Sequence, residues 1–330
     1  MLLNYVVWDV DPYIFHIGSR PIAWYGLLWT MVFIVGYYIM KNIYKKEKVG
    51  EEELDKLFIY MLISTVVGAR LGHCLFYEPA YYLSKPVEIL KIWEGGLASH
   101  GGAIGILIGL FIYAKKIKKP YIWILDRIVV PTAIGGAFIR MGNLMNSEIY
   151  GEPTTLPWGF KFVRDYPIGM PIENIPACHP TQIYEAIFCV LVFIYLLYAY
   201  YKQDMANKRP GFMFGIFLIV VFGSRILIEF IKNPQVEFET SMTLDMGQWL
   251  SIPFVIAGIW LVVKSFKKST RQRDNKTTRF EDTESQSRRI SKSVSRFGVQ
   301  CSTANGLFHP RISSRRDEKR FGREITFISH

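Results

Sequence analysis

The sequence is poor in the residues that build disulfide frameworks and zinc sites. Only 4 cysteines occur in 330 residues, at positions 74, 178, 189 and 301, and they are too few and too scattered for either role. Cys74 and Cys189 lie inside apolar runs, where a thiol packs as a small hydrophobe. Cys178 lies in a predicted loop without an evident partner, and a packed thiol is favoured there over a reactive one.

The short motifs of several large enzyme classes are also missing. The chain has no glycine-rich phosphate loop, no H-E-x-x-H, no C-x-x-C and no G-x-S-x-G nucleophile elbow. Their absence argues against a metal enzyme and against a serine hydrolase, and we predict neither a metal nor a cofactor. Any chemistry must then rely on acid–base groups, on cations and on a nucleophile that the substrate brings.

Net charge is nearly absent from residues 1–263. The whole chain has a formal net charge of +11, and residues 264–330 hold 17 Lys and Arg against 7 Asp and Glu, which accounts for +10. This tail has too few apolar residues for a core, so we predict a disordered segment that touches anionic lipid. The basic charge therefore does not indicate a nucleic-acid partner.

Long apolar runs dominate the rest of the chain. Each is close to the length of about 20 residues that crosses a bilayer as a helix, and no period-two alternation indicates a barrel. The first run has no charged segment before it and no small-residue cleavage site after it, so it is predicted to be a retained helix. The seven predicted spans are 21–40, 57–76, 97–114, 122–139, 183–201, 212–231 and 248–263.

The distribution of lysine and arginine between the spans predicts the orientation. Three connections are rich in basic residues: 41–56 with five, 115–121 with four and 202–211 with three. The alternate connections are poorer, so the N-terminus is expected outside and the basic tail inside. An all-α membrane protein with seven transmembrane helices follows, with a membrane domain over 1–263 and a cytoplasmic tail over 264–330.

The connection between the fourth and fifth spans has a different character. Residues 152–178 include five prolines, which exclude a long helix. We expect a small irregular head on the outer, periplasmic face.

Polar residues inside the spans gather toward one side of the membrane. Charged groups within lipid usually face a protein interior or a water-filled cavity. On the predicted topology they all lie in the outer halves of their spans, and the inner halves are expected to be nearly free of such groups. The members are Tyr25, Arg70, His73, His100, Arg140, His179, Gln182, Tyr184, Glu185, Arg225, Glu229 and Gln248. This pattern predicts a cationic pocket open to the outer leaflet.

Several members also have a purely structural interpretation. Arg225 and Glu229 are spaced i, i+4 and could neutralise one another. Arg70 is favoured as a brace between helices. Tyr25 could belong to an interfacial aromatic belt. The glycines at 101, 105 and 109 are spaced by four and favour close helix packing.

Two features favour a ligand site over these interpretations. The pair Gly101-Gly102 directly follows His100 and would let a substrate approach the imidazole. Arg140 and Arg225 come from different spans, and a guanidinium presents a planar fork that matches phosphate or carboxylate. An anionic lipid headgroup at the outer interface would suit such a pair.

Six segments in order then resemble one known family. They are "GARLGHCLFYEPAYY" (68–82), "EGGLASHGGAIG" (94–105), "IRMGNLMNSEIYG" (139–151), "HPTQIYEA" (179–186), "GSRILIEFIKNP" (223–234) and "MGQWLSIP" (246–253). Together they are similar to prolipoprotein diacylglyceryl transferases, over about residues 14–263. The resemblance implies a seven-span enzyme of the bacterial inner membrane, with its site toward the outer leaflet and a small periplasmic head.

The resemblance also implies an activity. Members of that family move the diacylglyceryl group of phosphatidylglycerol to the lipobox cysteine of a preprolipoprotein, forming a thioether and releasing glycerol phosphate. It implies catalytic roles for His100, Arg140 and Arg225. The implied phosphatidylglycerol-binding residues are Arg140, Asn143, Asn146, Glu148, Gly151, Tyr25, Glu229, Gly101 and Gly102.

The chain departs from the family pattern at three points. Ser147 stands where glycine is common, Val221 where tyrosine is common, and Lys232 where the family has arginine. A lipid transporter and a seven-helix receptor are the alternatives from other classes. A transporter would show internal repeats and a site near the midplane, neither of which is present. Incorporation of lipid into a cysteine peptide would separate the enzyme from both.

Overall fold

The computed structural model describes residues 5–18, 20–232 and 247–267. It also describes positions 244 and 283 and the backbone of 301–304 and 307–310. The chain forms two compact units, Met1–Lys267 and Lys268–His330. In the second, β5 (Cys301–Ala304) pairs antiparallel with β6 (Leu307–Pro310). Most of the tail for which disorder is predicted lies outside the described residues.

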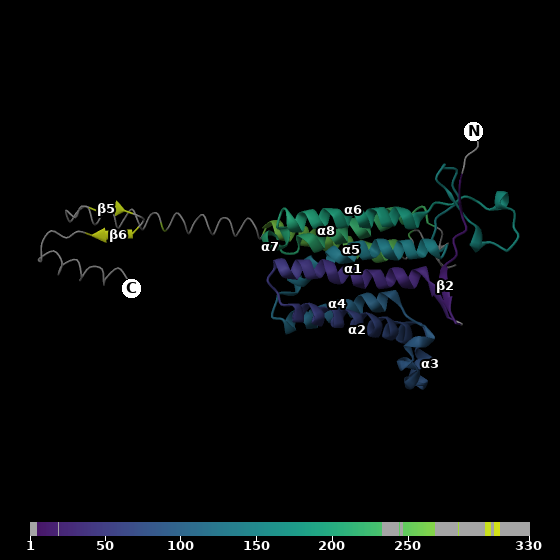
Figure 1. The fold of residues 1–330 in the computed structure, drawn as a ribbon, viewed down its shortest axis with the longest axis horizontal. Coiled ribbons are helices and arrows are strands. Elements are labelled where there is room, and N and C mark those ends of the chain that lie inside the picture. The colour runs from purple at the N-terminus through teal and green to yellow at the C-terminus, as the bar shows by residue number, and fades with distance from the viewer. Residues whose placement is uncertain are drawn as a thin grey trace, which may run out of the picture. The chain divides into compact units, whose positions relative to one another are not determined.

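Long helices lying side by side make up the first unit (Figure 1). Their bounds are α1 Trp24–Lys46, α2 Glu51–Phe76, α4 Ser99–Lys116, α5 Tyr121–Met145, α6 Thr181–Tyr201, α8 Phe212–Glu229 and a last helix Gly247–Lys267. Short helices connect them: α3 Pro79–Ser84, α7 Met205–Lys208, and the 3-10 turns η1 Pro86–Leu90, η2 Ile92–Glu94, η3 Val163–Asp165 and η4 Ile172–Asn174.

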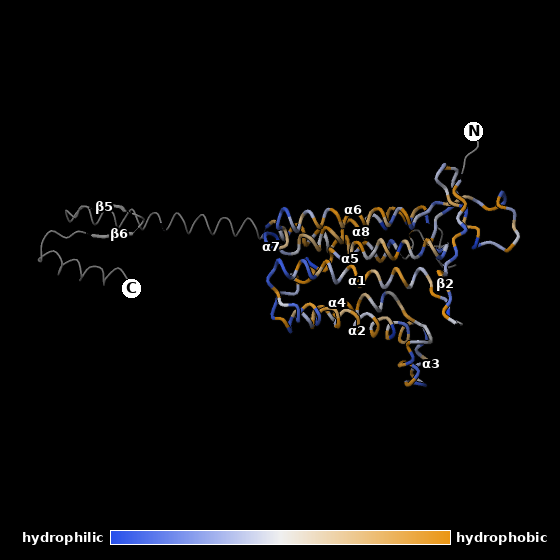
Figure 2. The backbone as a smooth tube through the Cα atoms, viewed as in Figure 1, coloured by the Kyte–Doolittle hydropathy of each residue, from blue (hydrophilic) through white to orange (hydrophobic). Residues whose placement is uncertain are grey.

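Apolar residues run along most of these helices (Figure 2). Among the described residues, six helices are long and apolar enough to cross a membrane: α1, α2, α5, α6, α8 and Gly247–Lys267. Their outer faces carry exposed aliphatic side chains, such as Ile59 and Ile63 on α2. The structure is therefore predominantly helical and fits a multi-pass membrane protein. The remaining long helix, α4, has 18 residues, begins with Ser-His-Gly-Gly and ends in two lysines.

Short strands that the sequence did not predict lie at one end of the bundle. An antiparallel hairpin joins β2 (Tyr13–Ile17) to β3 (Arg20–Ala23), and β1 (Val6–Trp8) pairs parallel with β4 (Phe160–Phe162). We call this end, with the strands and the 152–178 loop, the head end (Figure 1). The indole N–H of Trp8 donates to the carbonyl of Leu144 at 2.9 Å, which ties the N-terminal arm to the end of α5.

Two buried charged residues lie near the start of α5. The inner halves of the spans were expected to be nearly free of charged groups, and this expectation is wrong for α5. The carboxylate of Asp126 accepts the backbone N–H groups of Gly211 at 2.6 Å and Phe214 at 2.9 Å. These N–H groups lie at the start of α8, where the backbone has no carbonyl partner within the helix, and the carboxylate supplies the missing acceptor. Arg127 pairs with Glu47 at 2.7 Å and has no exposed surface. Both groups anchor helices to one another.

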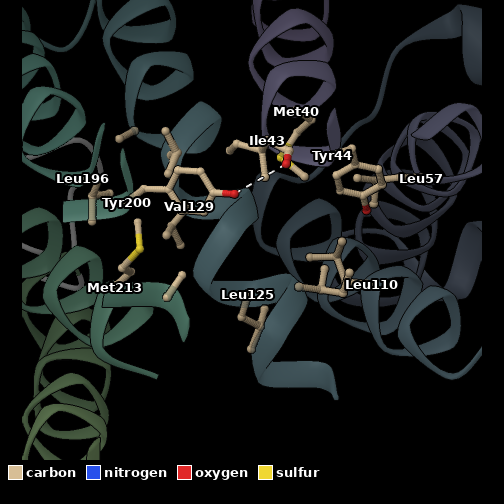
Figure 3. Packing of buried hydrophobic residues seen from close by; sticks show 14 of the residues in the cluster. Met40, Ile43, Tyr44, Leu57, Leu110, Leu125, Val129, Leu196, Tyr200 and Met213 are labelled. Atoms are coloured by element: carbon tan, nitrogen blue, oxygen red, sulfur yellow. Dashed lines mark hydrogen bonds between the residues drawn. The ribbon is translucent and has the colours of Figure 1, made fainter. Parts of the chain in front are cut away.

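The main apolar core also lies toward the end of the bundle that is opposite the head end. Its buried side chains come from α1, α2, α4, α5, α6 and α8 (Figure 3). Hydroxyl groups inside it are paired: Tyr44 with Tyr113 at 2.9 Å, and Tyr200 with the carbonyl of Ile43 at 3.5 Å. These paired hydroxyls and the apolar side chains around them hold the helices together at this end, which forms the base for the residues at the head end.

Glycines bring α2 and α4 into direct backbone contact, as their spacing predicted. A Cβ atom added to Gly105 would lie 2.8 Å from the Cα of Gly68, and one added to Gly72 would lie 2.6 Å from the Cα of Gly101. Such distances leave no room for a side chain. Small residues therefore set the separation of these two helices.

Replacing Gly105 should loosen this pair. Gly105→Ala places a methyl group against the backbone of α2, and overpacking of this kind costs about 1–3 kcal/mol. We expect a lower thermal midpoint of the purified protein in detergent. Gly223→Ala in α8 is the matched control, since nothing lies within 4 Å of its added Cβ. An equal midpoint for the two variants would contradict the contact.

Candidate active site

The stretch that follows α5 adopts a strained turn. Ser147 has φ +56° and Ile149 has φ +61°, so both lie in the left-handed region that favours glycine. A β-branched residue there is a conformational outlier. Such strain persists only where the surroundings hold it in place, and it occurs often at functional sites.

Side chains from the start of α6 hold this turn. The hydroxyl of Thr181 donates to the carbonyl of Ile149 at 2.8 Å, and the amide of Gln182 donates to the carbonyl of Glu148 at 2.6 Å. Thr181 and Gln182 are almost completely buried. The backbone around Glu148 is therefore fixed from a second helix, and its side chain turns back toward α5.

Glu148 accepts hydrogen bonds from side-chain amides of residues 139–151, which we call the signature stretch. Its Oε1 accepts the amide groups of Asn143 at 2.8 Å and of Asn146 at 3.2 Å. The amide oxygen of Asn143 in turn accepts Nη1 of Arg140 at 3.1 Å. Arg140, Asn143, Asn146 and Glu148 thus form one hydrogen-bonded group.

A chain of alternating charges connects this group to α8. Arg140 pairs with Glu185 of α6, and Glu185 pairs with the ammonium of Lys232 at 3.0 Å. Lys232 also lies 3.6 Å from Glu229, which lies 4.0 Å from Arg225. We call these five residues the charge chain. It contains three cations and two carboxylates and spans three helices.

The inner members of the charge chain are buried and its ends are not. Glu185, Lys232 and Glu229 are each less than 10% exposed. The side chain of Arg140 is 20% exposed and that of Arg225 is 38% exposed. Within the described residues, Nε of Arg225 is buried and makes no hydrogen bond. The two guanidinium groups therefore retain capacity to bind an anion.

Lys232 and Glu185 have larger roles than the sequence indicated. Glu185 stood among the polar residues without an assigned role, and Lys232 was noted only as a departure. The spacing of Arg225, Glu229 and Lys232 was the available signal, because steps of four and three place side chains on one helix face. Their common partner on α6 could not be read from spacing.

Tyr25 and Gly151 lie beside the same group of residues. The ring of Tyr25 covers Gly142, whose added Cβ would lie 2.7 Å from the ring. The N–H of Gly151 donates to the carbonyl of His179 at 2.8 Å, and Gly151 forms an isolated β-bridge with Lys232. An added Cβ on Gly151 would lie 2.8 Å from the methyl group of Thr181. Close backbone packing at Gly151 thus positions Lys232.

His100 belongs to a different pair of helices. It is exposed at the start of α4, at the head end of the bundle. Gly101 faces Gly72 of α2, and Gly102 faces Ala69. No hydrogen bond or ion pair among the described residues joins His100 to the charge chain. The structure thus brings the predicted residues of α5 and α8 together and leaves His100, Gly101 and Gly102 on the neighbouring α2–α4 pair.

Arg70 has the structural role that the sequence favoured. Its guanidinium donates to the backbone carbonyls of Glu88 at 2.7 Å, Ile89 at 3.0 Å and Gly95 at 2.5 Å. Only 3% of the residue is exposed. Arg70 therefore braces the loop that leads into α4 and so fixes where His100 begins its helix.

Cys178 is a packed thiol. It is 3% exposed, and its Sγ lies 3.8 Å from the carbonyl of Pro176. Burial, followed by the nearby charge of Asp165, raises the pKa of this thiol. The raised pKa keeps the sulfur protonated at neutral pH, so Cys178 is not an activated nucleophile.

The fold and the site together define a helical membrane protein with a cationic site at one end of its bundle. The family model for prolipoprotein diacylglyceryl transferase matches residues 12–264. The chain belongs to this family of transferases.

Similar proteins from three bacteria carry the name phosphatidylglycerol–prolipoprotein diacylglyceryl transferase. The protein from Porphyromonas gingivalis is 47% identical over 82% of this chain and 98% of its own length. Those from Tolumonas auensis and Chloroherpeton thalassium are 45% and 44% identical, over 80% and 81% of this chain and 99% and 96% of their own lengths. The match covers nearly the whole of each relative.

Ser147→Gly should relieve the strain of the turn. A left-handed conformation costs an L-residue about 1–2 kcal/mol, and glycine adopts it freely. We expect a higher thermal midpoint for Ser147→Gly than for Ser147→Ala, which removes the same hydroxyl but keeps the strain. Differential scanning fluorimetry in detergent measures both. A Ser147→Ala variant as stable as Ser147→Gly would show that the turn is not strained.

Lys232→Met should disrupt the charge chain. It leaves Glu185 and Glu229 buried without their shared cation, and breaking a buried pair costs about 3–5 kcal/mol. We expect a markedly lower thermal midpoint and loss of activity. Lys232→Arg should restore both, since it keeps the charge. Lys85→Met removes an exposed lysine and serves as the control. A similar fall in thermal midpoint and activity in that variant would show that Lys232 has no special role.

Proposed function

We propose that the protein transfers the diacylglyceryl group of phosphatidylglycerol to the lipobox cysteine of preprolipoproteins. The reaction forms a thioether, releases glycerol phosphate and is the first step of bacterial lipoprotein maturation. The names of its relatives and the extent of the match support this activity. The observation that carries it is the charge chain, which holds two partly exposed arginines from different helices in one assembly.

The two arginines are proposed to bind the phosphate of the lipid headgroup. A guanidinium can donate two parallel hydrogen bonds to a phosphate. Arg140 and Arg225 would act together, with Glu185, Lys232 and Glu229 fixing their separation. Asn143 and Asn146 would hold headgroup oxygens beside Arg140. Glu148 accepts both of their amides and would orient Arg140 through Asn143. Tyr25 and Gly151 complete this binding group through their packing against it.

The chemical step is a displacement at carbon. The thiolate sulfur of the acceptor cysteine attacks the glyceryl carbon that carries the phosphate ester. A C–S bond forms, the C–O bond breaks, and the electron pair leaves with the phosphate of glycerol phosphate. Negative charge grows on that phosphate in the transition state, where the preorganised arginines stabilise it.

His100 is proposed as the base that receives the thiol proton. A free thiol has a pKa of about 8.5, so only a few per cent is thiolate at neutral pH. The imidazole is exposed at the start of α4, where a substrate can approach it. Gly101 and Gly102 would let the substrate pass close to it, in addition to their packing against α2.

The proposed membrane placement has seven spans in the bacterial inner membrane. α4 would be the seventh span, because it runs along α2 through their shared glycines. The end opposite the head carries clustered basic residues, including Lys45 and Lys46 in the last turn of α1 and Lys115 and Lys116 in the last turn of α4. On the positive-inside rule this end faces the cytoplasm. The head, residues 152–178, and the site would then face the outer leaflet, and the basic tail 264–330 would lie inside.

Purified protein, phosphatidylglycerol and a lipobox peptide test this function directly. Thioether product is measured by mass spectrometry, and a Cys→Ser peptide should give none. Arg140→Ala and Arg225→Ala should each lower kcat/KM by at least about 100-fold, the range for removing one preorganised donor. Full activity of either folded variant would contradict the proposal that the two arginines bind the phosphate together.

The same assay tests whether His100 acts as the base or only supports the structure around it. His100→Asn keeps a polar side chain of similar size but cannot act as the base. We expect a reduced rate that recovers as the pH rises and more of the peptide becomes thiolate. A near-normal rate with an unchanged pH profile would exclude His100 as the base, and the cationic site alone would then stabilise the thiolate.

A further inference from the structure

A cavity lies in the head, outside the bundle. Its volume is about 530 Å³, and it lies between the N-terminal arm, the end of α5 and the 163–175 part of the head. The residues that matter below are Asn146, Ser147, Arg164, Tyr166 and Ile168. We call it the head pocket. Pockets of 300–1,000 Å³ are typical of ligand sites.

The head pocket borders the candidate active site. Asn146 lines the pocket, and its amide donates to Glu148 of the signature stretch at 3.2 Å. An occupant of the pocket would therefore lie next to the residues that hold the lipid headgroup. This position suits the second substrate of a transfer reaction.

An unpaired hydroxyl lines this pocket. Ser147 is 5% exposed, and its Oγ is buried without a hydrogen-bond partner among the described residues. Buried polar groups are nearly always paired, so this hydroxyl requires a partner. Because the Oγ is covered in this conformation, a backbone carbonyl or N–H of a bound chain would supply the partner once the Ser147 side chain rotates toward the pocket.

Arg164 is the one cation among the described residues that line the head pocket, and it is already paired with two carboxylates. Nε of Arg164 lies 3.0 Å from Asp9, and its Nη2 lies 3.5 Å from Asp11. Ile168, by contrast, is fully exposed at the pocket. A phosphate would find no free cation among the described residues that line the pocket, whereas an uncharged, extended peptide segment would find both apolar contact and a hydrogen-bonding hydroxyl.

We propose that the head pocket binds the polypeptide substrate, at the residues that follow its acceptor cysteine. The proposal rests on the transferase function above. The apolar segment that precedes the cysteine suits the lipid and the apolar faces of the helices. The segment that follows it must leave the bilayer, and the pocket lies beyond the end of α5 on the side of the head. Contact through the peptide backbone tolerates varied sequences after the cysteine.

Paired isoleucine variants of the full-length protein test this site. Ile168→Asp alters the pocket, and Ile172→Asp makes the same change at an exposed residue of the head that does not line it. Two peptides are compared, one ending at the cysteine and one continuing six residues with uncharged side chains. Binding of fluorescent Cys→Ser versions is measured by anisotropy, and transfer is measured with the cysteine forms.

The expected result is a selective loss with the longer peptide. The wild type should bind the longer peptide more tightly than the shorter one. Ile168→Asp should weaken binding of the longer peptide about tenfold and raise its KM with kcat unchanged, the sign of lost ground-state binding. The shorter peptide, the KM for phosphatidylglycerol and the Ile172→Asp variant should be unaffected.

Several outcomes would overturn the head pocket as a peptide site. Equal binding of the two peptides by the wild type would do so, as would equal effects of the two variants. An increase in the KM for phosphatidylglycerol alone would assign the pocket to the lipid. Absence of thioether product would contradict the transferase function, while the anisotropy measurements would still decide whether the pocket binds the peptide.

Discussion

Three helices meet at one buried ammonium group. Lys232 lies 3.0 Å from Glu185 and 3.6 Å from Glu229, and each carboxylate faces an arginine on its other side. Removing charges from water is expensive, so such a group is stable only when every member is paired. Because the pairing alternates along the chain, the position of Arg140 on α5 depends on the position of Arg225 on α8. The arrangement keeps two like charges at a fixed separation without direct contact.

The rest of the head end serves this geometry. The strained turn at Ser147 and Ile149 directs Glu148 back to Asn143, and side chains of α6 hold the turn in place. Gly151 packs closely enough to bridge Lys232. At the other end, the apolar core and the buried charges of α5 fix the helices. A rigid base and a strained, polar head end are a common division between stability and function.

Much of this could be predicted from the sequence, because lipid imposes simple rules on a chain. Apolar length gave the helices, and the glycine spacing gave the contact of α2 with α4. The signature stretch grouped Arg140, Asn143, Asn146 and Glu148 correctly, since they lie within one helix end and the turn after it. The sequence interpretation failed at Asp126 and Arg127, which were overlooked inside an apolar run, and at the short strands of the arm. Strands of three to five residues carry too little pattern to be recognised.

The sequence by itself determined the class of the protein, its family and the residue types of its site, because membrane insertion and local spacing are properties of neighbouring residues. Only the tertiary structure decided which charges touch. Glu185 pairs with Lys232 across a gap of 47 residues and also with Arg140, and no periodicity encodes such contacts. It also showed that His100 stands on a separate pair of helices and that Ser147 has a left-handed backbone. These facts depend on how helices pack, which is set by interactions between residues far apart in the chain.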